Sequence, residues 1–451
     1  MSDIIAAIAT GRAPCAIGIL RLSGPGCAAL TGRVFTPKQP FADAPDRRLV
    51  LGLLHDRQGR VIDECLGVVC RAPHSYTGEE TVELQCHGSP AMLAAGLESL
   101  LAAGARQAGP GEFTRRAFLN GKLDLTQAEA VVDLIDAETA DAAANAAGQL
   151  GGALKRAIGP VYDGLTDLCS HFHAVLDYPD EDIEDFGAAE LSGALDRAGA
   201  ALQELLATYE KGRHLRQGVR AVLLGKPNAG KSSLLNRLAG YDRVIVTDIA
   251  GTTRDTVEEP VRVGRVLLRL TDTAGIREAG DAIEALGVAR SEQAAREAEL
   301  ALFVCDASQP LTDEDRRAIE AAKCAPRSLA LCNKSDLPAV VSPDELPFDT
   351  VLTVSARTGA GLDALPALLE GWFLGENACD GSLLTNPRQF GALDRASRAI
   401  ERAKTGLCLG VTPDAVLTDV EEAMAALGEV TGRTVREDIT NRIFERFCVG
   451  K

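Results

Sequence analysis

The sequence contains no run of apolar residues long enough to span a lipid bilayer, and it shows no N-terminal signal segment. Its 12 cysteines are scattered between Cys15 and Cys448, and no two of them form a Cys-x-x-Cys pair. We therefore expect reduced thiols, mostly serving as small core residues, in a soluble cytoplasmic protein that has no membrane partner.

The chain also has fewer basic residues than acidic ones. The chain has 47 Lys and Arg residues against 64 Asp and Glu residues, which gives a formal net charge of −17. An acidic protein is not a general nucleic-acid coat, so any contact with RNA needs a local basic face. Four arginines of the C-terminal part offer such a face, and they fit ordinary solvated helix charges equally well: Arg433, Arg436, Arg442 and Arg446. No Gly-x-Gly-x-x-Gly segment follows a strand, so we infer no FAD site.

The order of apolar patterns predicts a multidomain chain. Residues 1–120 alternate short apolar runs with Gly and Pro turns, which predicts an α+β domain. Helical spacing follows over 121–217 and again over 377–451, and an α/β cassette occupies 218–376 between them. One helical domain interrupted by an inserted cassette explains this order, and two unrelated helical domains are the alternative.

The most informative motif is Gly225–Ser232, which fits Gly-x-x-x-x-Gly-Lys-Ser and follows the apolar run 221–224. Its glycines let the backbone turn so that N–H groups point at phosphate oxygens. Lys231 can reach the outer phosphates, and the Ser232 hydroxyl can bind Mg²⁺. The loop therefore predicts a nucleotide site built from Asn228, Ala229, Gly230, Lys231, Ser232 and Ser233.

Four further segments appear in the order of a GTP-binding domain. Asp272-Thr273-Ala274-Gly275 follows a predicted strand and would face Mg²⁺. Asn333-Lys334-Ser335-Asp336 follows residues 329–332, and its carboxylate can accept two hydrogen bonds from guanine but not from adenine. Ser355-Ala356 fits the loop that touches the guanine carbonyl, and Thr252-Thr253 can complete the metal shell. Together these segments resemble the GTPase branch of phosphate-loop proteins.

The residue after Gly275 is Ile276, where Ras-like GTPases have the glutamine that orients the attacking water. Another group must therefore position the water, and Glu278, Asp281 and Glu284 are the nearby acidic candidates. No arginine is marked as a finger, although Arg254 and Arg277 are candidates. A monovalent cation held by Asn228 and the carbonyls of residues 247–252 could neutralise the developing charge instead.

A more specific likeness covers essentially the whole chain. The phosphate loop extended to Asn236, the switch segment 247–255 and the tail Phe-Cys-Val-Gly-Lys451 resemble the MnmE/TrmE family of tRNA-modifying GTPases. The likeness continues through residues 18–24, 76–84 and 111–124. Ribosome-assembly GTPases would share the GTPase motifs, but not the N-terminal motifs or the terminal cysteine motif.

The resemblance implies two sites that the spacing of residues alone does not predict. It implies that the N-terminal domain forms a homodimer and binds 5-formyl- or 5,10-methylene-tetrahydrofolate through Arg21, Glu83, Lys122 and Lys451. It also implies that the GTPase domains meet when K⁺ is bound by Asn228, Thr247, Ile249 and Thr252. Within that site, Ser232 and Thr253 would hold Mg²⁺, Glu284 would position water, and Thr247 and Thr252 would also line the GTP site.

The resemblance further implies the chemistry and a partner. The thiol of Cys448 would be needed for modification, and the FAD-dependent protein MnmG would act with this chain on tRNA. The product would carry an aminomethyl or carboxymethylaminomethyl group at C5 of the wobble uridine. Two alternatives stay open: a regulatory or ribosome-assembly GTPase that acts as a binding switch, and a scaffold that dimerises and hydrolyses GTP only to recycle.

Overall fold

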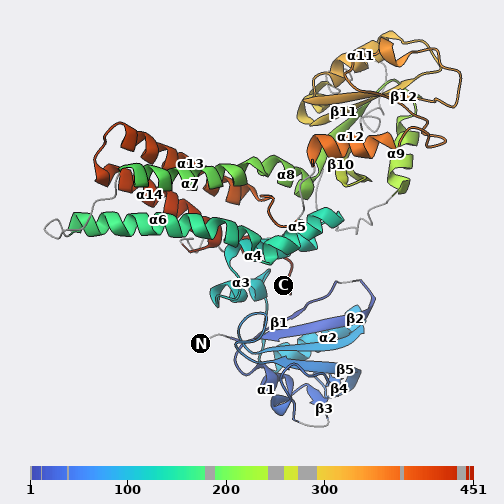
Figure 1. Cartoon of the computed structure of the whole chain (residues 1–451). Helices are drawn as coiled ribbons and strands as arrows, with labels where there is room; N and C mark the ends of the chain where they lie inside the picture. Colours follow the sequence, from blue (N-terminus) through green and yellow to red (C-terminus); the bar gives the residue numbers. More distant parts are fainter. Residues whose placement is uncertain are drawn as a thin grey trace. The chain divides into compact units, whose positions relative to one another are not determined.

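The computed structural model describes residues 3–11, 13–37, 40–177, 188–241, 258–272, 292–375, 380–433, 443–445 and 447–450. The chain forms two compact units, of which the first combines two segments that lie far apart in the sequence. Unit 1 comprises Met1–Val132 and Thr418–Lys451, and unit 2 comprises Asp133–Leu417 (Figure 1).

Unit 1 is built on a seven-stranded sheet in the order β3-β4-β5-β6-β2-β1-β7. Neighbouring strands are antiparallel except β1 and β7, which run parallel. Helix α2 (Pro90–Ala102) packs on the sheet through Leu93 and Leu100, which are buried. The strands are β1 (Ile5–Ile8), β2 (Cys15–Ser23), β3 (Phe35–Pro37), β4 (Val50–His55), β5 (Val61–Cys70), β6 (Thr81–Gly88) and β7 (Arg106–Gln107).

Alternation along the central strands separates a core face from a more open face. On β6, Val82 and Leu84 are buried, whereas Glu83 between them is partly exposed. On β2, Leu20 and Leu22 are buried on either side of Arg21. Because β2 and β6 are paired with Arg21 opposite Glu83, both charged side chains leave the sheet on the same face.

Unit 1 contains further helices besides α2. They are α1 (Cys27–Thr31), α3 (Glu112–Leu119) and α4 (Leu125–Ile135), which continues into unit 2. After the last of the long helices, α14 (Pro413–Thr431), the chain returns to the N-terminal sheet: Val449 forms a β-bridge with Pro110. Phe444 and Phe447 are buried there beside Ala128.

Unit 2 contains a six-stranded sheet in the order β13-β12-β11-β8-β10-β9. All neighbours are parallel except β9 and β10, so the carboxyl ends of five strands lie along one edge. The strands are β8 (Val219–Leu224), β9 (Glu258–Val263), β10 (Val266–Asp272), β11 (Leu300–Asp306), β12 (Arg327–Asn333) and β13 (Val351–Thr353). The described helices of this cassette are α9 (Lys231–Tyr241), α11 (Asp313–Ala322) and α12 (Ala364–Phe373).

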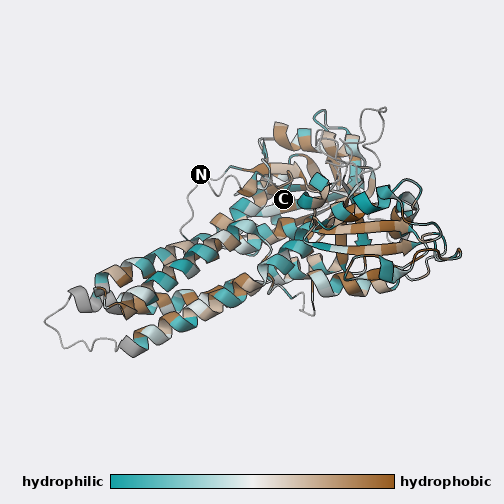
Figure 2. Cartoon of the chain, turned by 90° about the horizontal axis from the view of Figure 1, so that it is seen from above, coloured by the Kyte–Doolittle hydropathy of each residue, from teal (hydrophilic) through white to brown (hydrophobic). Residues whose placement is uncertain are grey.

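The helical part of unit 2 comes from both sides of this cassette. It consists of α5 (Ala140–Leu150), α6 (Ala153–Asp177), α7 (Ala188–Ala207), α8 (Tyr209–Gln217) and α13 (Pro387–Cys408). Helix α7 packs against α13, where Gln203 Nε2 donates to Ser397 Oγ at 2.9 Å and Lys404 pairs with Asp196. The long helices carry hydrophobic and hydrophilic residues side by side (Figure 2), as expected where one helix face packs on a neighbour. Packing of α7 on α13 is what a single interrupted helical domain predicts.

These findings confirm the predicted fold class: an α+β N-terminal part, a helical part, and an inserted α/β cassette. Strands form at the short apolar runs near residues 16–20, 49–53, 65–70 and 81–85, and α13 starts at Pro387 with Asn386 as its cap. Strands β9 and β11 were missing from the sequence prediction. None of the described helices combines the length and the hydropathy that crossing a membrane requires.

Candidate functional site

The loop after β8 is shaped by glycines that no other residue could replace. Gly225 and Gly230 have φ values of +142° and +100°. A Cβ atom on Gly225 would lie 2.2 Å from the carbonyl oxygen of Val304, and one on Gly230 would lie 2.1 Å from Nδ2 of Asn333. The loop leads directly into α9, whose first N–H groups have no acceptor within the helix. Loop and helix together therefore offer an anion site.

Asn333 joins the phosphate loop to the loop after β13. Its Nδ2 donates to the carbonyl oxygen of Ala229 at 2.8 Å, and its Oδ1 accepts from the N–H of Ala356 at 2.9 Å. The side chain is only 2% exposed, so these bonds are shielded from water. Three segments predicted separately from the sequence thus meet around one amide.

Asp336 lies beside Ser355, as a base-recognition site requires. Ser355 Oγ donates to Asp336 Oδ1 at 2.6 Å, and Arg357 pairs with Asp336 Oδ2 at 2.7 Å. The hydrogen bond from Ser355 is the main cause that lowers the pKa of this carboxyl. Asp336 is therefore an ionised acceptor at neutral pH, which is the form that binds two N–H donors.

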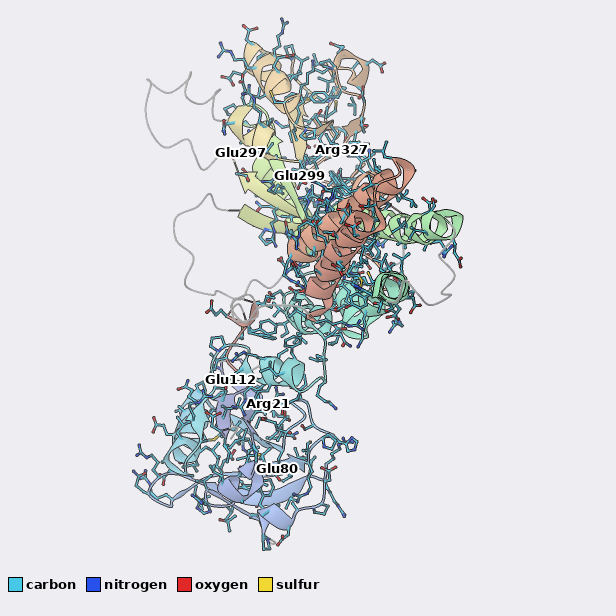
Figure 3. The ribbon with its side chains drawn as sticks, turned by 90° about the vertical axis from the view of Figure 1, so that its left-hand side faces the viewer. Arg21, Glu80, Glu112, Glu297, Glu299 and Arg327 are labelled. Atoms are coloured by element: carbon cyan, nitrogen blue, oxygen red, sulfur yellow. The ribbon has the colours of Figure 1, made fainter. Side chains whose placement is uncertain are left out.

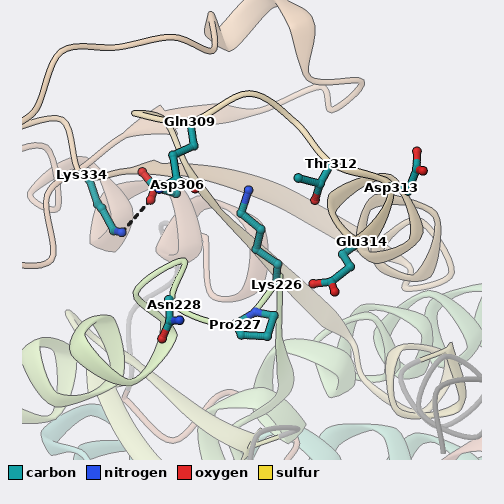
Figure 4. Close-up of a pocket in the computed structure, with 9 residues that line it drawn as sticks. All are labelled: Lys226, Pro227, Asn228, Asp306, Gln309, Thr312, Asp313, Glu314 and Lys334. Atoms are coloured by element: carbon teal, nitrogen blue, oxygen red, sulfur yellow. Dashed lines mark hydrogen bonds and ion pairs between the residues drawn. The ribbon is translucent and has the colours of Figure 1, made fainter. Parts of the chain in front are cut away.

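Lysine side chains lie in and beside the phosphate loop. Lys231 Nζ donates to the carbonyl oxygens of Gly225 and Lys226, at 2.6 and 2.8 Å. Lys334 Nζ pairs with Asp306 Oδ2 at 2.6 Å, and both side chains line a cavity of about 500 Å³ together with Lys226 and Asn228 (Figure 4). Burial opposes ionisation of Asp306, but hydrogen bonds from Lys334 and Ser308 outweigh it and lower its pKa. The wall of the cavity thus carries the Lys334–Asp306 ion pair and the Lys226 charge beside the phosphate loop.

A second group of predicted residues meets in unit 1. Arg21 Nε donates to Glu83 Oε1 at 2.7 Å, and the guanidinium lies 5.8 Å from the ring centres of both Tyr76 and Phe113. Arg21 Nη1 also donates to the carbonyl oxygen of Gly450 at 3.3 Å, so the tail of the chain reaches this group (Arg21 is labelled in Figure 3). Lys122 Nζ donates to the carbonyl oxygen of Pro73, in the segment that leads to Tyr76.

Comparison with known proteins agrees with this arrangement. The family model described as the GTP-binding protein TrmE N-terminus matches residues 4–122, and the one described as the MnmE helical domain matches residues 125–448. Curated relatives named "tRNA modification GTPase MnmE" match all of this chain. The protein of Roseiflexus sp. (strain RS-1) is 45% identical over 99% of its own length, and those of Chloroflexus aurantiacus and Aquifex aeolicus are 43% and 41% identical over 100% of theirs. The chain belongs to the MnmE family.

Among solved structures, the G domain of the T. maritima FeoB iron transporter aligns with 33% of this chain and 94% of that domain, at 22% identity and a TM-score of 0.25. That score is too low to support an argument, so the assignment to the MnmE family rests on the family models and the full-length relatives.

Several residues that the MnmE resemblance implies lie outside the described part of the chain. The structure gives the backbone of Asp272, which pairs in register with Leu223 at the end of β8. The predicted residues that lie outside the described ranges are Thr247, Ile249, Thr252, Thr253, Arg254, Thr273, Ala274, Gly275, Arg277, Glu278, Asp281, Glu284, Arg436, Arg442, Arg446 and Lys451. Their roles remain predictions. Ser232 and Ser233 are exposed in the first turn of α9, and Cys448 is exposed with its carbonyl oxygen accepting from Gly111 N at 3.3 Å.

Four side chains that contact the predicted site residues were missed in the sequence: Tyr76, Phe113, Asp306 and Arg357. Asp306 had a usable signal, because it follows the buried run Leu300–Cys305 as a polar residue at a strand end. Tyr76 and Phe113 had no usable sequence signal, because aromatic residues are common near turns. Arg357 follows Ser355-Ala356 directly, but its contact with Asp336 depends on how the two loops fold.

Proposed function

We propose that the chain is a potassium-dependent, GTP-hydrolysing tRNA modification enzyme of the cytoplasm. Acting with the FAD-dependent protein MnmG, it would add an aminomethyl or carboxymethylaminomethyl group to C5 of the wobble uridine of certain tRNAs. The observation that carries the proposal is the full-length match to relatives named tRNA modification GTPase, at 41–45% identity. The geometry around Asn333 supports the GTP-binding part of it.

In this proposal, GTP lies along the edge formed by the carboxyl ends of β8, β10, β12 and β13. The N–H groups of Asn228–Ser233 would hold the phosphates. Gly230 lets the loop pass close to Asn333, where a Cβ atom would clash with Nδ2. Asp336 would accept from the guanine edge, while Lys334 and the Ser355-Ala356 loop would flank the base. Bound Mg²⁺ and K⁺ would neutralise charge that develops on the phosphates.

The metal ligands follow from the loop chemistry. Ser232 sits in the first turn of α9, where its hydroxyl can hold Mg²⁺ together with Thr253 and the Asp272 strand end. Asn228 has a left-handed backbone with φ of +62° and an exposed side chain, which suits an amide oxygen that binds K⁺ with Thr247, Ile249 and Thr252. Oxygen ligands are the kind that both ions prefer.

Glu284 would orient the attacking water in place of the glutamine that Ile276 replaces. We predict that Glu284→Ala leaves GTP affinity near that of the unmodified chain and abolishes hydrolysis, as measured by single-turnover GTPase assays. Glu278→Ala serves as the matched control and should hydrolyse GTP normally. Retained turnover in Glu284→Ala would assign the role to another carboxylate.

The N-terminal domain, residues 1–120, would bind 5-formyl- or 5,10-methylene-tetrahydrofolate and form the homodimer. Glu83 would hold the 2-amino edge of the pterin, and Arg21, Lys122 and Lys451 would suit the carboxylates of the glutamate tail. The support is geometric: Arg21 and Glu83 are paired beside two aromatic rings, and the residue before Lys451 contacts Arg21. The remaining proposed domains are a GTPase domain over 218–376 and helical parts over 121–217 and 377–451.

Nucleoside mass spectrometry of tRNA tests the whole proposal. Cells lacking the gene receive either the unmodified chain or Cys448→Ser, with Cys408→Ser as a control because Cys408 is also an exposed cysteine. We expect the C5-aminomethyl-type wobble uridines to disappear without the gene, and to return with the unmodified chain and Cys408→Ser but not with Cys448→Ser. Unchanged tRNA in the deletion strain would instead favour a GTP-driven binding switch.

A further inference from the structure

A cluster of metal-binding side chains lies in unit 1, apart from the residues proposed for GTP and folate. Asp63 and Cys65 are on β5, and Cys86 is on β6. One carboxylate oxygen and the two Sγ atoms all lie within 4.8 Å of one another. Both thiols are 3% exposed, so the cluster is enclosed rather than spread over the surface.

Strand register explains why the three side chains converge. Leu66 pairs with Gln85 in the antiparallel ladder, so the next positions along it, Cys65 and Cys86, face each other. Side chains two residues apart on a strand share a face, which brings Asp63 to the same side as Cys65. Strand register therefore places all three side chains on one face of the sheet.

The carboxylate is held in place by a histidine. His87 donates its backbone N–H to Asp63 Oδ2 at 2.8 Å, and His87 Nδ1 lies 2.8 Å from Asp63 Oδ1. The Asp63 side chain is 8% exposed and that of His87 is 79% exposed. Hydrogen bonds of this kind fix ligating carboxylates in metal sites, and the exposed imidazole marks the side from which an ion would enter.

We propose that Asp63, Cys65 and Cys86 form a three-ligand site for a thiophilic divalent cation of the zinc class, with His87 orienting the carboxylate. Zinc–sulfur and zinc–oxygen distances of about 2.3 and 2.0–2.2 Å place tetrahedral ligand atoms roughly 3.5–3.8 Å apart. The three ligand atoms lie within 4.8 Å of one another, so binding would draw them closer by up to about 1 Å. Thiolate ligands select zinc-like ions over Mg²⁺ and Ca²⁺, and water would take the fourth position.

Binding must displace protons. Contact with Cys65 and burial raise the pKa of the Cys86 thiol, and zinc binds the thiolate form of cysteine, so the thiol protons have to leave when the ion enters. The balanced step is two R–SH plus M²⁺ giving M(SR)₂ plus two H⁺, with no change in oxidation state. Apparent affinity should therefore rise with pH.

A second pair of buried thiols offers a contrast. Cys305 and Cys332 face each other on β11 and β12 with their sulfurs 3.9 Å apart. Within the described ranges, the Asp63 group is the one set of three or more such ligands that close together. The carboxylate of Asp63 beside the two thiols thus distinguishes the proposed ion site from an ordinary pair of core cysteines.

The test uses the full-length chain, freed of metal with a chelator and then titrated with Zn²⁺ against a chromophoric competitor. We expect one tight equivalent per chain, and a thiolate-to-cobalt charge-transfer band when Co²⁺ replaces Zn²⁺. Cys65→Ser and Cys86→Ser should abolish both signals. Asp63→Asn should weaken binding at least tenfold, and His87→Ala about 10- to 100-fold.

Cys70→Ser is the matched control, because it alters another thiol of the same strand outside the cluster. It should bind Zn²⁺ like the unmodified chain. His87→Ala changes an exposed side chain, so it tests the site even if the buried cysteine variants fail to fold. Equal binding in Cys86→Ser and the unmodified chain, or no tight equivalent in the unmodified chain, would overturn the proposal. The proposal would also be overturned if a titration of the denatured, unreduced chain found two thiols fewer than expected, because Cys65 and Cys86 would then form a cross-strand disulfide.

Discussion

At the scale of single residues, the carboxylate proposed to recognise guanine already has partners. Asp336 binds the Ser355 hydroxyl through one oxygen and Arg357 through the other. The Arg357 side chain is 74% exposed, so this ion pair is screened by water. A guanine edge that approaches Asp336 has to compete with the guanidinium for the same acceptor.

We predict that Arg357→Ala strengthens GDP binding by a factor of up to about five, because an exposed ion pair contributes up to about 1 kcal/mol. Titration with a fluorescent GDP analogue measures the change, and Arg316→Ala, which alters another exposed arginine of the cassette, should have no effect. Weaker binding in Arg357→Ala would mean that the arginine contacts the nucleotide instead.

The sequence predicted the site residues that are local in the chain, but not their partners. Asn333, Lys334 and Asp336 follow a buried strand directly, so a motif and a hydropathy pattern suffice to find them. The bond from Asn333 to Ala229 joins residues 104 positions apart, and the bond from Arg21 to Gly450 joins residues 429 positions apart. Such contacts depend on strand order and on how the tail packs, which periodicity does not encode.

At the scale of elements, a buried ion pair ties the phosphate loop to α11. Lys226 Nζ lies 2.8 Å from Asp315 Oδ2; the side chains are 11% and 0% exposed. The same oxygen accepts from the N–H and the hydroxyl of Thr312, which completes a capping box at the start of α11. One carboxylate therefore anchors the loop and begins the helix.

We predict that Asp315→Ala destabilises unit 2 by about 3 kcal/mol or more, because it leaves the Lys226 charge buried without its partner. Asp313→Ala removes an exposed carboxylate from the same helical turn and should cost less than about 1 kcal/mol. Urea unfolding followed by fluorescence reports on this unit, since Trp372 in α12 is the single tryptophan of the chain. Equal losses in the two variants would contradict the anchoring role.

Helix α8 is joined to the sheet by Glu299, which lies just before β11 (Figure 3). Its Oε1 pairs with Arg213 and lies 3.0 Å from His214 Nε2, and its Oε2 accepts from Arg220 N at 3.2 Å. Burial opposes ionisation, but the bonds from His214 and Arg213 prevail and lower the pKa of Glu299 to about 2. The carboxylate is thus more acidic in the folded chain than in the unfolded one.

The stabilisation from this lowered pKa is complete above the unfolded value of 4.5 and is lost as the pH falls toward 2. We predict that acid costs unit 2 up to about 3 kcal/mol through Glu299, since each pKa unit is worth about 1.36 kcal/mol. Glu299→Gln should be less stable at pH 7 and should show a flatter dependence on pH between 5 and 2 by Trp372 fluorescence. The same slope in both chains would contradict it.

At the scale of the whole molecule, the sequence indicated an interrupted helical domain because helical stretches flank the α/β cassette on both sides, and the packing of α7 on α13 agrees with that prediction. The family resemblance places Lys451 of the tail at the N-terminal domain, whereas the hydropathy pattern carries no signal for the bridge between Val449 and Pro110. Long, periodic elements are thus predictable, whereas a single distant bridge is not.

The proposed meeting of two GTPase domains makes hydrolysis a property of the assembled dimer. We predict that the GTPase rate rises at least about tenfold when K⁺ replaces Na⁺ at constant ionic strength, because no arginine finger is marked in the sequence to supply that charge. Asn228→Ala should abolish the difference between the two salts. Equal rates of the unmodified chain in K⁺ and Na⁺ would remove the cation from the mechanism.

Contact between Arg21 and Gly450 has a consequence for biosynthesis. The strands of the N-terminal sheet are all made by residue 107, yet the carbonyl that binds Arg21 is added 343 residues later. A nascent chain on the ribosome can therefore form this sheet early, but it must be translated almost to residue 451 before the surroundings of Arg21 are finished. A peptide tag fused after Lys451 would begin two residues after the carbonyl that binds Arg21, so affinity tags are better placed elsewhere.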